Sequence, residues 1–459
     1  MRILVDQSGY DLLNIGDVAM LQSCVTRLRG QWPAAEIMVI ATAPERLAAY
    51  CPGTVAIGRT FADLPGFRLG PRKARLAVEQ AWKIAGPYLA RQHGRPSPGR
   101  PRTAVQAVRA ADLVVASGGG YVTDTWWWHA SGVLSLLSLA QRLGKPTAMF
   151  GQGIGPMKRR LLRAQSRAVL PRLTLLGLRE DRTGRPLASS LGVAPTVLAL
   201  TGDDALEQGS HPGAPASPGA MASPGSVASP GARAAGSAAG HVLGVNLRVS
   251  GYAGVDQATA ASVASVVRAV ASELRADLVG LPVSRYATAA DAGALRELWP
   301  DRSRADQPQP ERPQPDQPRP VGSPAAGLAM DDLTTPEDLV MAVAQCRAVI
   351  TGSYHAALFS LAAGVPAVCL TKSPYYDAKF GGLVALFPGA CRTVSLGGPE
   401  AAARLEAAVR EAWQLPPAAR AAAAAAAAAL CDAGRQAYAQ FRLAVEGHGN
   451  LVERPVLLR

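Results

Sequence analysis

The sequence predicts an α/β protein with two doubly wound, Rossmann-like domains. Short apolar runs alternate with helical segments through both halves of the 459-residue chain, and none of these runs carries a charged residue. Strands buried on both faces belong in parallel sheets that are covered by helices. Ligands of such sheets bind at the carboxyl ends of the strands. With two domains, the cleft between them is the expected site.

The strands and helices follow from these runs in chain order. In the first half, strands are expected at 3–5, 37–41, 113–116, 147–150, 173–177 and 196–198, and helices at 18–28, 132–142, 158–170 and 180–191. In the second half, strands are expected at 242–247, 278–281, 348–351 and 367–370. Between the first two of these, apolar residues recur at helical spacing from Val263 to Leu274,.

Changes in composition set the domain boundaries. We expect an N-terminal α/β domain at 1–206 and a disordered linker at 207–240, where Ala-Ser-Pro-Gly occurs three times,. A second α/β domain is expected at 241–400, with a disordered proline- and glutamine-rich insertion at 301–326,. Residues 401–459 are expected to form an alanine-rich helical tail.

Charge and composition exclude several classes. The net charge is +13 and the pI is about 9.8, which favours anionic ligands or reflects an arginine-rich codon composition,. Aromatic residues make up 5% and the arginines are scattered, so nucleic acid is not an expected partner,. No apolar run reaches the roughly 18 residues of a membrane span. Asp6 interrupts any signal-peptide core,. A cytoplasmic protein is expected, in at most peripheral contact with the membrane, at its inner face.

The six cysteines are widely spread and form no Cys-x-x-Cys pair. They are expected to be buried free thiols, with no zinc site and no disulfide framework. No metal and no cofactor is expected. The oligomeric state stays open.

Two motifs follow the first and third expected strands. In Asn14-Ile-Gly-Asp17, Asp17 stands at a helix start, where it either caps the helix or binds a ligand,. In Ser117-Gly-Gly-Gly-Tyr-Val-Thr-Asp124, the glycines leave bare N–H groups that can cradle an anion or a sugar,. Asp124 can bind a hydroxyl or act as a base. One indole of Trp126–Trp128 is expected to border the cleft, unless all three serve packing or an interface.

The segment Gly151-Gln-Gly-Ile-Gly-Pro156 does not fit a dinucleotide fingerprint. Its glycine spacing is wrong, and Pro156 stops the helix that should begin there,. A nicotinamide enzyme is therefore not expected.

The second half carries the sharper candidates. Arg248 ends an apolar strand and needs an anionic partner, either a ligand or a structural salt bridge,. His355 lies in the first turn of a helix that starts near Ser353, where the neutral imidazole is favoured and can serve as a base,. Lys379 offers an ammonium group in a chain that is poor in lysine.

Taken together, these segments resemble the polysaccharide pyruvyl transferase family, from residue 1 to about 390. Six elements occur in the family's order: Asn14-Ile-Gly-Asp17, Gly118-Gly-Gly with Asp124, Gly151-Gln-Gly-Ile-Gly-Pro156, Leu178-Arg-Glu-Asp181, Gly202-Asp-Asp-Ala205, and Gly352-Ser-Tyr-His355 with Gly364-Val-Pro and Lys379. One departure stands out. The family often has Arg-Leu-His where this chain has Ser353-Tyr354-His355, so Arg248, Arg179 or Lys379 is expected to replace the missing arginine, or the donor differs.

The resemblance implies a glycosyltransferase-B-like pair of domains. It also implies transfer of pyruvate from phosphoenolpyruvate onto two hydroxyls of a sugar as a ketal, with release of phosphate. The acceptor sugar is carried on a lipid, a nucleotide or a polymer. The expected roles are catalysis by His355 and Asp124, donor binding by Arg248, Lys379, Gly118, Gly119, Gly120 and Ser353, and acceptor binding by Asn14, Asp17, Trp126 and Gln152.

Two other functions fit the same sequence. One is a glycosyltransferase that uses a nucleotide sugar on the same architecture. The other is a carbohydrate-binding or assembly factor without catalytic activity, which the missing arginine favours.

Overall fold

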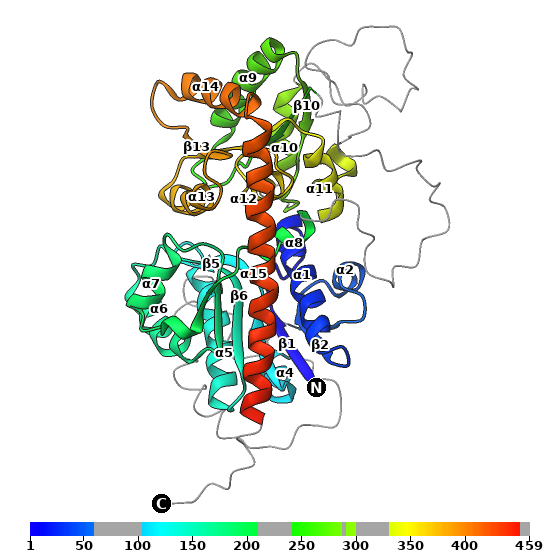
Figure 1. The fold of residues 1–459 in the computed structure, drawn as a ribbon, viewed down its shortest axis with the longest axis vertical. Coiled ribbons are helices and arrows are strands. Elements are labelled where there is room, and N and C mark those ends of the chain that lie inside the picture. Colours follow the sequence, from blue (N-terminus) through cyan, green and yellow to red (C-terminus); the bar gives the residue numbers. More distant parts are fainter. Residues whose placement is uncertain (59–102, 210–240, 287–290, 300–329, 450–459) are drawn as a thin grey trace, which may run out of the picture. The chain divides into compact units, whose positions relative to one another are not determined.

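A computed structural model describes residues 1–58, 103–209, 241–286, 291–299 and 330–449 (Figure 1). These residues form two compact units. Unit 1 comprises residues 1–205, 381–386 and 429 onward, and unit 2 comprises residues 206–380 and 387–428. The predicted insertion at 301–326 and most of the predicted linker lie outside the described residues, whereas 207–209 belong to a short helix.

Unit 1 is built on an eight-stranded, fully parallel sheet in the order β3-β2-β1-β4-β6-β7-β8, with β5 paired to β6. Chain order therefore reverses between β1 and β4, as in a doubly wound fold. The strands are β1 (Arg2–Asp6), β2 (Glu36–Ile40), β3 (Val55–Ile57), β4 (Leu113–Ala116), β5 (Gly119–Val122), β6 (Thr147–Ile154), β7 (Leu175–Leu178) and β8 (Leu198–Leu200).

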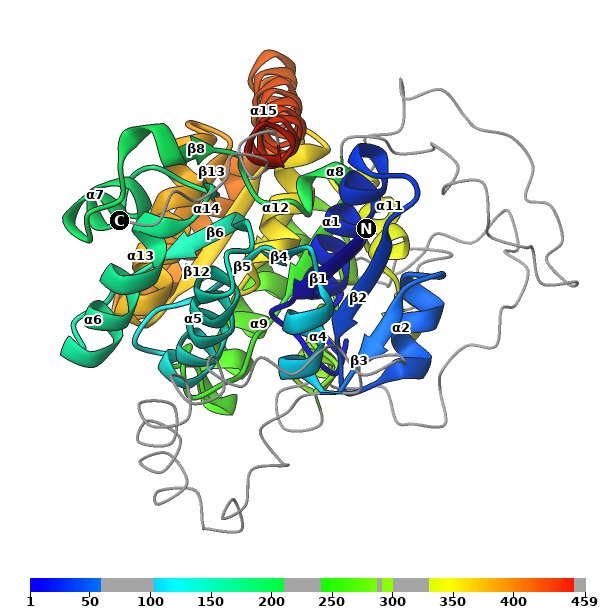
Figure 2. The same cartoon turned by 90° about the horizontal axis from the view of Figure 1, so that it is seen from below.

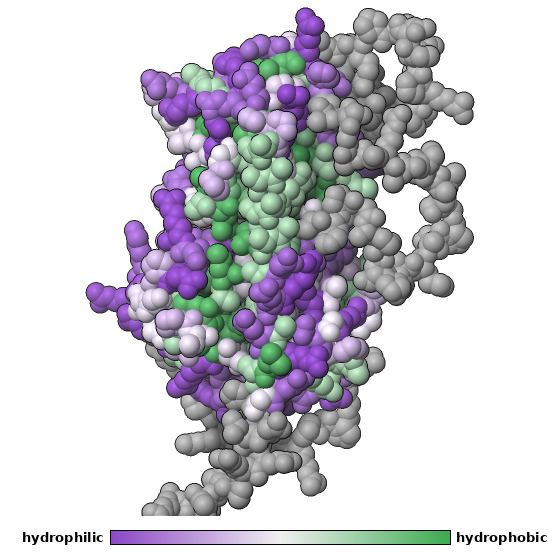
Figure 3. All heavy atoms as spheres, in the orientation of Figure 1, coloured by the Kyte–Doolittle hydropathy of each residue, from purple (hydrophilic) through white to green (hydrophobic). Residues whose placement is uncertain are grey.

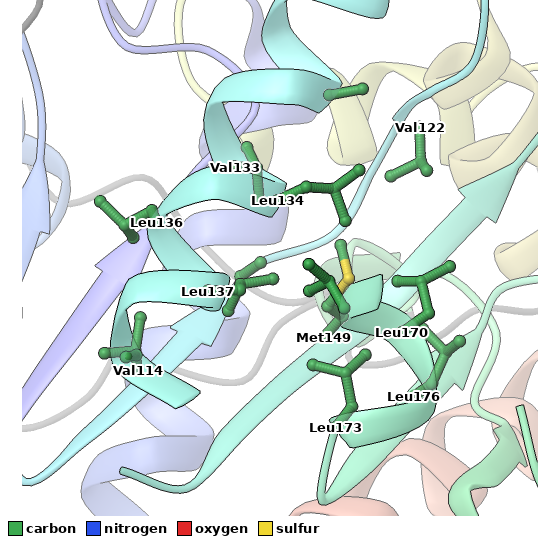
Figure 4. Packing of buried hydrophobic residues seen from close by; sticks show 14 of the residues in the cluster. Val114, Val122, Val133, Leu134, Leu136, Leu137, Met149, Leu170, Leu173 and Leu176 are labelled. Atoms are coloured by element: carbon green, nitrogen blue, oxygen red, sulfur yellow. The ribbon is translucent and has the colours of Figure 1, made fainter. Parts of the chain in front are cut away.

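Helices cover both faces of this sheet (Figure 2). One face packs against α1 (Ile15–Gln31), α2 (Pro44–Tyr50) and the later part of the last helix. The other packs against α4 (Ala104–Ala110), α5 (Trp127–Arg142), α6 (Arg160–Val169) and α7 (Gly184–Ser190). Figure 4 shows the second core, where Leu134 and Leu137 of α5 pack toward Met149 of β6. Each fully buried leucine of this kind contributes about 1.5–3 kcal/mol.

Unit 2 carries a five-stranded parallel sheet in the order β10-β9-β11-β12-β13, in which chain order reverses between β9 and β11. The strands are β9 (Val242–Asn246), β10 (Asp277–Gly280), β11 (Ala348–Thr351), β12 (Ala367–Thr371) and β13 (Cys391–Ser395). One face packs against α9 (Gln257–Leu274), α10 (Asp291–Leu295) and α14 (Ala401–Trp413). The other helices among the described residues of the unit are α8 (Leu206–Gly209), α11 (Pro336–Ala344) and α12 (Tyr354–Ala362). Helix α13 (Pro374–Leu386) begins in unit 2, and its residues 381–386 belong to unit 1.

The helical tail differs from the expectation in one respect. Pro416 and Pro417 divide it into α14 and a 33-residue helix α15 (Pro417–Gly449), because proline cannot continue a helix,. Residues of α15 up to 428 belong to unit 2, and those from 429 belong to unit 1. In unit 1, the ring of Tyr438 stacks on Phe150 with centroids 3.7 Å apart. Figure 3 shows the alanine-rich part of α15 as a pale green stripe.

Two expected glycine turns are strands. The third expected strand of unit 1 is followed at once by β5, which contains Gly119 and Gly120, and β6 continues through Gly151 to Ile154. Glycine is usually depleted in strands, which is why sequence patterning assigned both stretches to turns. Strands β3 and β13 were not anticipated either. Among the described helices, none is both long and apolar enough to cross a membrane.

Candidate functional site

In each parallel sheet there is a point where the order of the strands reverses, because the chain continues to one side of the first strand and later returns to its other side. We call this the reversal point, and ligands of doubly wound folds bind there. In unit 1 that point lies between the carboxyl ends of β1 and β4, and in unit 2 between those of β9 and β11. The motifs Ser117–Asp124 and Gly352–His355 begin there. The expectation that these motifs follow strand ends is therefore confirmed in each unit.

His355 lies at the reversal point of unit 2. It is the second residue of α12, directly after the turn that leaves β11. The N–H of Gly352 in that turn donates to the carbonyl of Asn246 at the end of β9, 3.0 Å away. The imidazole is 7% exposed and packs edge-on to the ring of Tyr354. Ser353 is buried, and its backbone N–H donates to the Thr351 hydroxyl at 2.8 Å.

Arg248 takes the salt-bridge alternative. Its Nε lies 2.6 Å from one oxygen of Asp291, and its NH2 group donates to the other at 3.1 Å. Both side chains are buried. Burial alone would lower the pKa of the guanidinium, but Asp291, with smaller contributions from Tyr252 and Tyr376, outweighs it and raises the pKa above its usual value. Arg248 is therefore a fixed cation at the edge of the candidate site.

Asp291 contacts several groups around Arg248. Its Oδ2 also accepts hydrogen bonds from the Asn246 amide at 2.8 Å and from the backbone N–H groups of Val283 and Ser284 at 2.9 Å each. A buried carboxylate satisfied in this way holds Arg248 in one orientation.

Lys379 lies among tyrosines. Its Nζ is 5.2–5.7 Å from the ring centroids of Tyr354, Tyr375 and Tyr376, within the range of cation–π attraction,. Tyr376 in turn stacks on Tyr252, whose hydroxyl accepts from Arg248 at 3.1 Å. Unit 2 thus brings together all four of its predicted residues: Arg248, Ser353, His355 and Lys379. The sequence analysis did not identify Asp291 or the tyrosines.

In unit 1, Asn14 and not Asp17 caps α1. The Asn14 side chain accepts from the N–H groups of Gly16 and Asp17, at 2.9 and 3.3 Å. The carboxylate of Asp17 accepts from the Ser8 hydroxyl at 2.7 Å, beyond the end of β1. Asn14 therefore shapes the helix start, and Asp17 is the half-buried group that lies at the reversal point.

The glycines of unit 1 make room for a guanidinium. A Cβ added at Gly153 would lie 2.5–2.6 Å from three atoms of the Arg179 guanidine group, and one at Gly120 would lie 2.8 Å from its NH2 group. Arg179 follows β7, is 5% exposed, and has its NH1 group 3.7 Å from Asp203. We call Gly120, Gly153, Arg179 and Asp203 the glycine seat. The sequence placed Arg179 directly after a strand, but its glycine neighbours are distant in the chain.

Gln152 makes hydrogen bonds within unit 1. Its side chain is fully buried, and its amide donates to the Ser117 carbonyl at 2.6 Å and to the Tyr121 hydroxyl at 3.0 Å. Burial is also the main reason why the pKa of Tyr121 is raised well above its usual value. The amide fixes the chain between β4 and β5, so an acceptor-binding role would have to be indirect.

Asp124 and the tryptophans lie where α5 and α6 begin. The Asp124 carboxylate accepts from the backbone N–H groups of Lys158 and Arg159, so it anchors the start of α6. Trp126 is half-buried and packs on the core, whereas Trp128 is 41% exposed. Of the three indoles Trp128 is the most exposed, and the acceptor-binding role of Trp126 stays a prediction.

No described residues form a metal centre: within that part of the chain, no three His, Cys, Asp or Glu side chains are grouped to hold an ion. All six cysteines are described; they are free and buried, as expected.

The comparisons with known proteins agree with this picture at two levels. At the level of fold, the chain is similar to glycosyltransferase-B-type structures. A protein from Listeria monocytogenes described as a UDP-N-acetylglucosamine 2-epimerase matches with a TM-score of 0.56 and 11% identity, over 99% of this chain and 98% of that one. Arabidopsis thaliana UGT89C1 complexed with quercetin matches with a TM-score of 0.53 and 11% identity, over 97% and 98%. These identities establish the fold alone.

At the level of family, the model of the polysaccharide pyruvyl transferases matches residues 14–288 and 310–374, which is most of the chain. The chain therefore belongs to the polysaccharide pyruvyl transferase family. No curated protein matches it.

Proposed function

We propose that the chain transfers the pyruvyl group of phosphoenolpyruvate onto two hydroxyls of one sugar of a polysaccharide or its precursor. The products are a ketal and inorganic phosphate. Family membership is the observation that carries this proposal. The side chains at the reversal points of the two sheets support it, because they supply an imidazole, a carboxylate and three cations.

The donor carries a carboxylate and a phosphate, and so needs cationic partners. In unit 2 these are Arg248, held by Asp291, and Lys379 above its tyrosines. In unit 1 the glycine seat offers Arg179, whose planar guanidinium suits a carboxylate or a phosphate,. Arg248, Arg179 or Lys379 takes the place of the arginine that the family often carries at the position of Ser353.

The reaction proceeds through C2 of the donor. A proton is added to the methylene carbon, which makes C2 electrophilic, and a sugar hydroxyl attacks C2 as its own proton is removed. Phosphate leaves, and the second hydroxyl attacks C2 to close the ketal. The balance is one donor and one diol giving one ketal and one phosphate, with one hydroxyl proton on the new methyl group and the other on phosphate. We assign the proton transfers to His355, and contacts with the acceptor to Asp17 and Asp124.

The test is phosphate release from phosphoenolpyruvate across a panel of sugar acceptors. Proton transfer by a positioned group contributes about 10²–10⁴-fold, so His355→Ala should lower turnover by at least that range without unfolding the chain. The matched control is His241→Ala, which removes an exposed histidine just before β9. Near-normal turnover of His355→Ala would refute the assignment.

Thermal shift separates the alternatives. A ligand at 100 times its Kd stabilises a fold by about 2.7 kcal/mol. Stabilisation by phosphoenolpyruvate but not by a nucleoside diphosphate supports the proposal, and the reverse supports a glycosyltransferase. Acceptor binding with no phosphate release from any donor indicates a carbohydrate-binding protein.

A further inference from the structure

A long stretch of unit 1 carries no acidic residue. From residue 125 to residue 179 there is no Asp or Glu, while nine residues are Lys or Arg. The acids that bracket the stretch are engaged within the protein: Asp124 accepts from two backbone N–H groups, and Glu180 accepts from the N–H of Thr183. Asp181, just before α7, pairs with Arg185 of that helix at 3.0 Å.

Folding gathers these positive charges beside exposed apolar groups. Helices α5 and α6 lie side by side (Figures 1 and 2), joined by the hydrogen bond from Ser131 of α5 to Gln165 of α6 at 2.8 Å. Their N-terminal ends meet where the Arg159 guanidinium lies 5.2 Å from the Trp127 ring. Trp128 is 41% exposed and Leu161 is 58% exposed. We call Trp128, Lys158, Arg159, Arg160, Leu161 and Arg167 the basic edge; its four cationic residues are all exposed.

The outward face of α6 has the composition of an interfacial helix. Arg160 and Arg167 are seven residues apart and so lie on one stripe, two turns apart,. Beside them run Leu161, Ala164 and Ala168, which are also exposed, while Leu162 is buried. Arginine beside exposed leucine and alanine, with no acidic residue, matches a helix that lies on an anionic lipid surface.

The geometry points to the basic edge as a surface that docks on anionic lipid. Cationic side chains near an anionic bilayer each add to binding, and an exposed indole sits well among headgroups. A single-stranded nucleic acid would require a series of stacking rings, and among the described residues of this edge one indole is exposed,.

The location of the basic edge suggests what docking on a membrane would do. The N-terminal ends of α5 and α6 follow β5 and β6, so the basic edge lies beside Asp124 at the carboxyl end of the unit 1 sheet. A membrane docked here would present an acceptor sugar on a lipid carrier next to that carboxylate. This identification of the acceptor as lipid-linked rests on the proposed function, whereas the docking surface does not.

The test is sedimentation of the full chain with vesicles, without donor or acceptor. The vesicles are phosphatidylcholine alone or with about 30 mol% phosphatidylglycerol. Binding should require the anionic lipid and fall steeply at about 0.5 M salt. The double variant Arg160→Gln/Arg167→Gln should weaken it about 25-fold, at about fivefold per arginine. Trp128→Ser/Leu161→Ser should weaken it further and leave the salt dependence in place.

The matched control removes the same charge from unit 2, by Arg285→Gln/Arg296→Gln at two exposed positions. Equal loss in both double variants, or equal binding to neutral and anionic vesicles, would overturn the inference. So would capture of an oligonucleotide that Arg160→Gln/Arg167→Gln abolishes while vesicle binding persists. Vesicle binding without phosphate release would count against the proposed function and leave the docking surface standing.

Discussion

Two buried arginines, one in each unit, follow a parallel strand and are held in opposite ways. Arg248 of unit 2 is gripped by a carboxylate: Asp291 meets it at 2.6 and 3.1 Å and is itself satisfied by three further N–H donors. Arg179 of unit 1 has its carboxylate, Asp203, at 3.7 Å, and its guanidinium is accommodated by the absence of side chains at Gly120 and Gly153.

The difference teaches that similar burial can serve different ends. The exposed fractions of the two arginines are 7% and 5%, so burial alone does not separate them. The Arg248–Asp291 ion pair holds the guanidinium in one position, and the free energy of unfolding of unit 2 depends on that pair. The Arg179–Asp203 pair is longer, and Gly120 and Gly153 leave the space that the guanidinium occupies, so a change at these glycines should affect ligand binding more than stability.

The largest effect is expected for the ion pair. Arg248→Met leaves the Asp291 carboxylate buried without its cation, which typically costs about 3–5 kcal/mol of the free energy of unfolding. Arg179→Met should cost less stability while lowering phosphate release at least tenfold. Chemical denaturation and the phosphate assay measure the two effects.

A double variant serves as the control. Arg248→Met/Asp291→Asn removes both charges but keeps an oxygen that accepts the three N–H groups, so it should recover most of the lost stability. If Arg248→Met proves as stable as the parent chain, the contrast between the two arginines fails.

A smaller effect is expected at the glycine seat. In Gly153→Ala, the new methyl group needs the space of the Arg179 guanidinium, which lies at the end of a flexible side chain and can shift. We expect a roughly tenfold rise in the KM for phosphoenolpyruvate and a loss of stability below about 1 kcal/mol, as for a displaced hydrogen-bonding group. Steady-state kinetics and thermal melting give both values.

Gly30 provides the matched comparison. It lies in α1, and an added Cβ would meet no atom within 4 Å. Gly30→Ala should leave the KM unchanged and stabilise the helix by about 0.5–1 kcal/mol. A KM that stays normal in Gly153→Ala would show that Arg179 takes no part in donor binding.

The smallest expected effect is on the pH dependence of stability, and it should be similar in the two units. Burial is the main cause that raises the pKa of Cys51 in unit 1 and of Cys346 in unit 2 from 9.0 to about 12 each. The unfolded chain releases these protons near pH 9 and the folded chain near pH 12. The contribution of these two thiols to stability should therefore be constant below pH 9 and be lost as the pH rises from 9 to 12.

Denaturant midpoints measured across this pH range test the expectation. Cys51→Ala and Cys346→Ala should each reduce the alkaline slope by a similar amount. A slope that responds to one substitution and not to the other would indicate that the two units unfold separately.

The sequence predicted the fold well because the strands are buried on both faces. The run 113–116 coincides with β4, and 348–351 with β11. The missed strands have a common physical cause. β3 has three residues, β5 begins with two glycines, and β13 mixes buried residues with half-buried and exposed ones. None of them gives a continuous apolar run.

The positions of Arg248 and His355 in the candidate site were predictable, because each residue follows shortly after an apolar strand. It was not predictable where it depends on partners distant in the chain. Asp291 lies 43 residues from Arg248, and nothing in the sequence links Gly120 and Gly153 to Arg179. The exposure of Trp126 and Trp128 was not predictable either, because neighbouring indoles differ in exposure only through packing. The cleft between the two domains stays a prediction.

Helix α15 has a practical consequence for dissecting the molecule. In unit 1, Arg27 donates to Asp204 at 2.6 Å, and the Tyr438 hydroxyl of α15 donates to the other oxygen of the same buried carboxylate at 2.8 Å. A fragment ending near residue 206 would lack Tyr438. The Asp204 carboxylate would then lose one hydrogen-bond donor, and the ring of Phe150 would lose the aromatic ring that stacks on it. Isolating the N-terminal half as a soluble piece thus calls for residues 429–449 as a grafted or added peptide, which makes the chain a natural candidate for split-protein complementation.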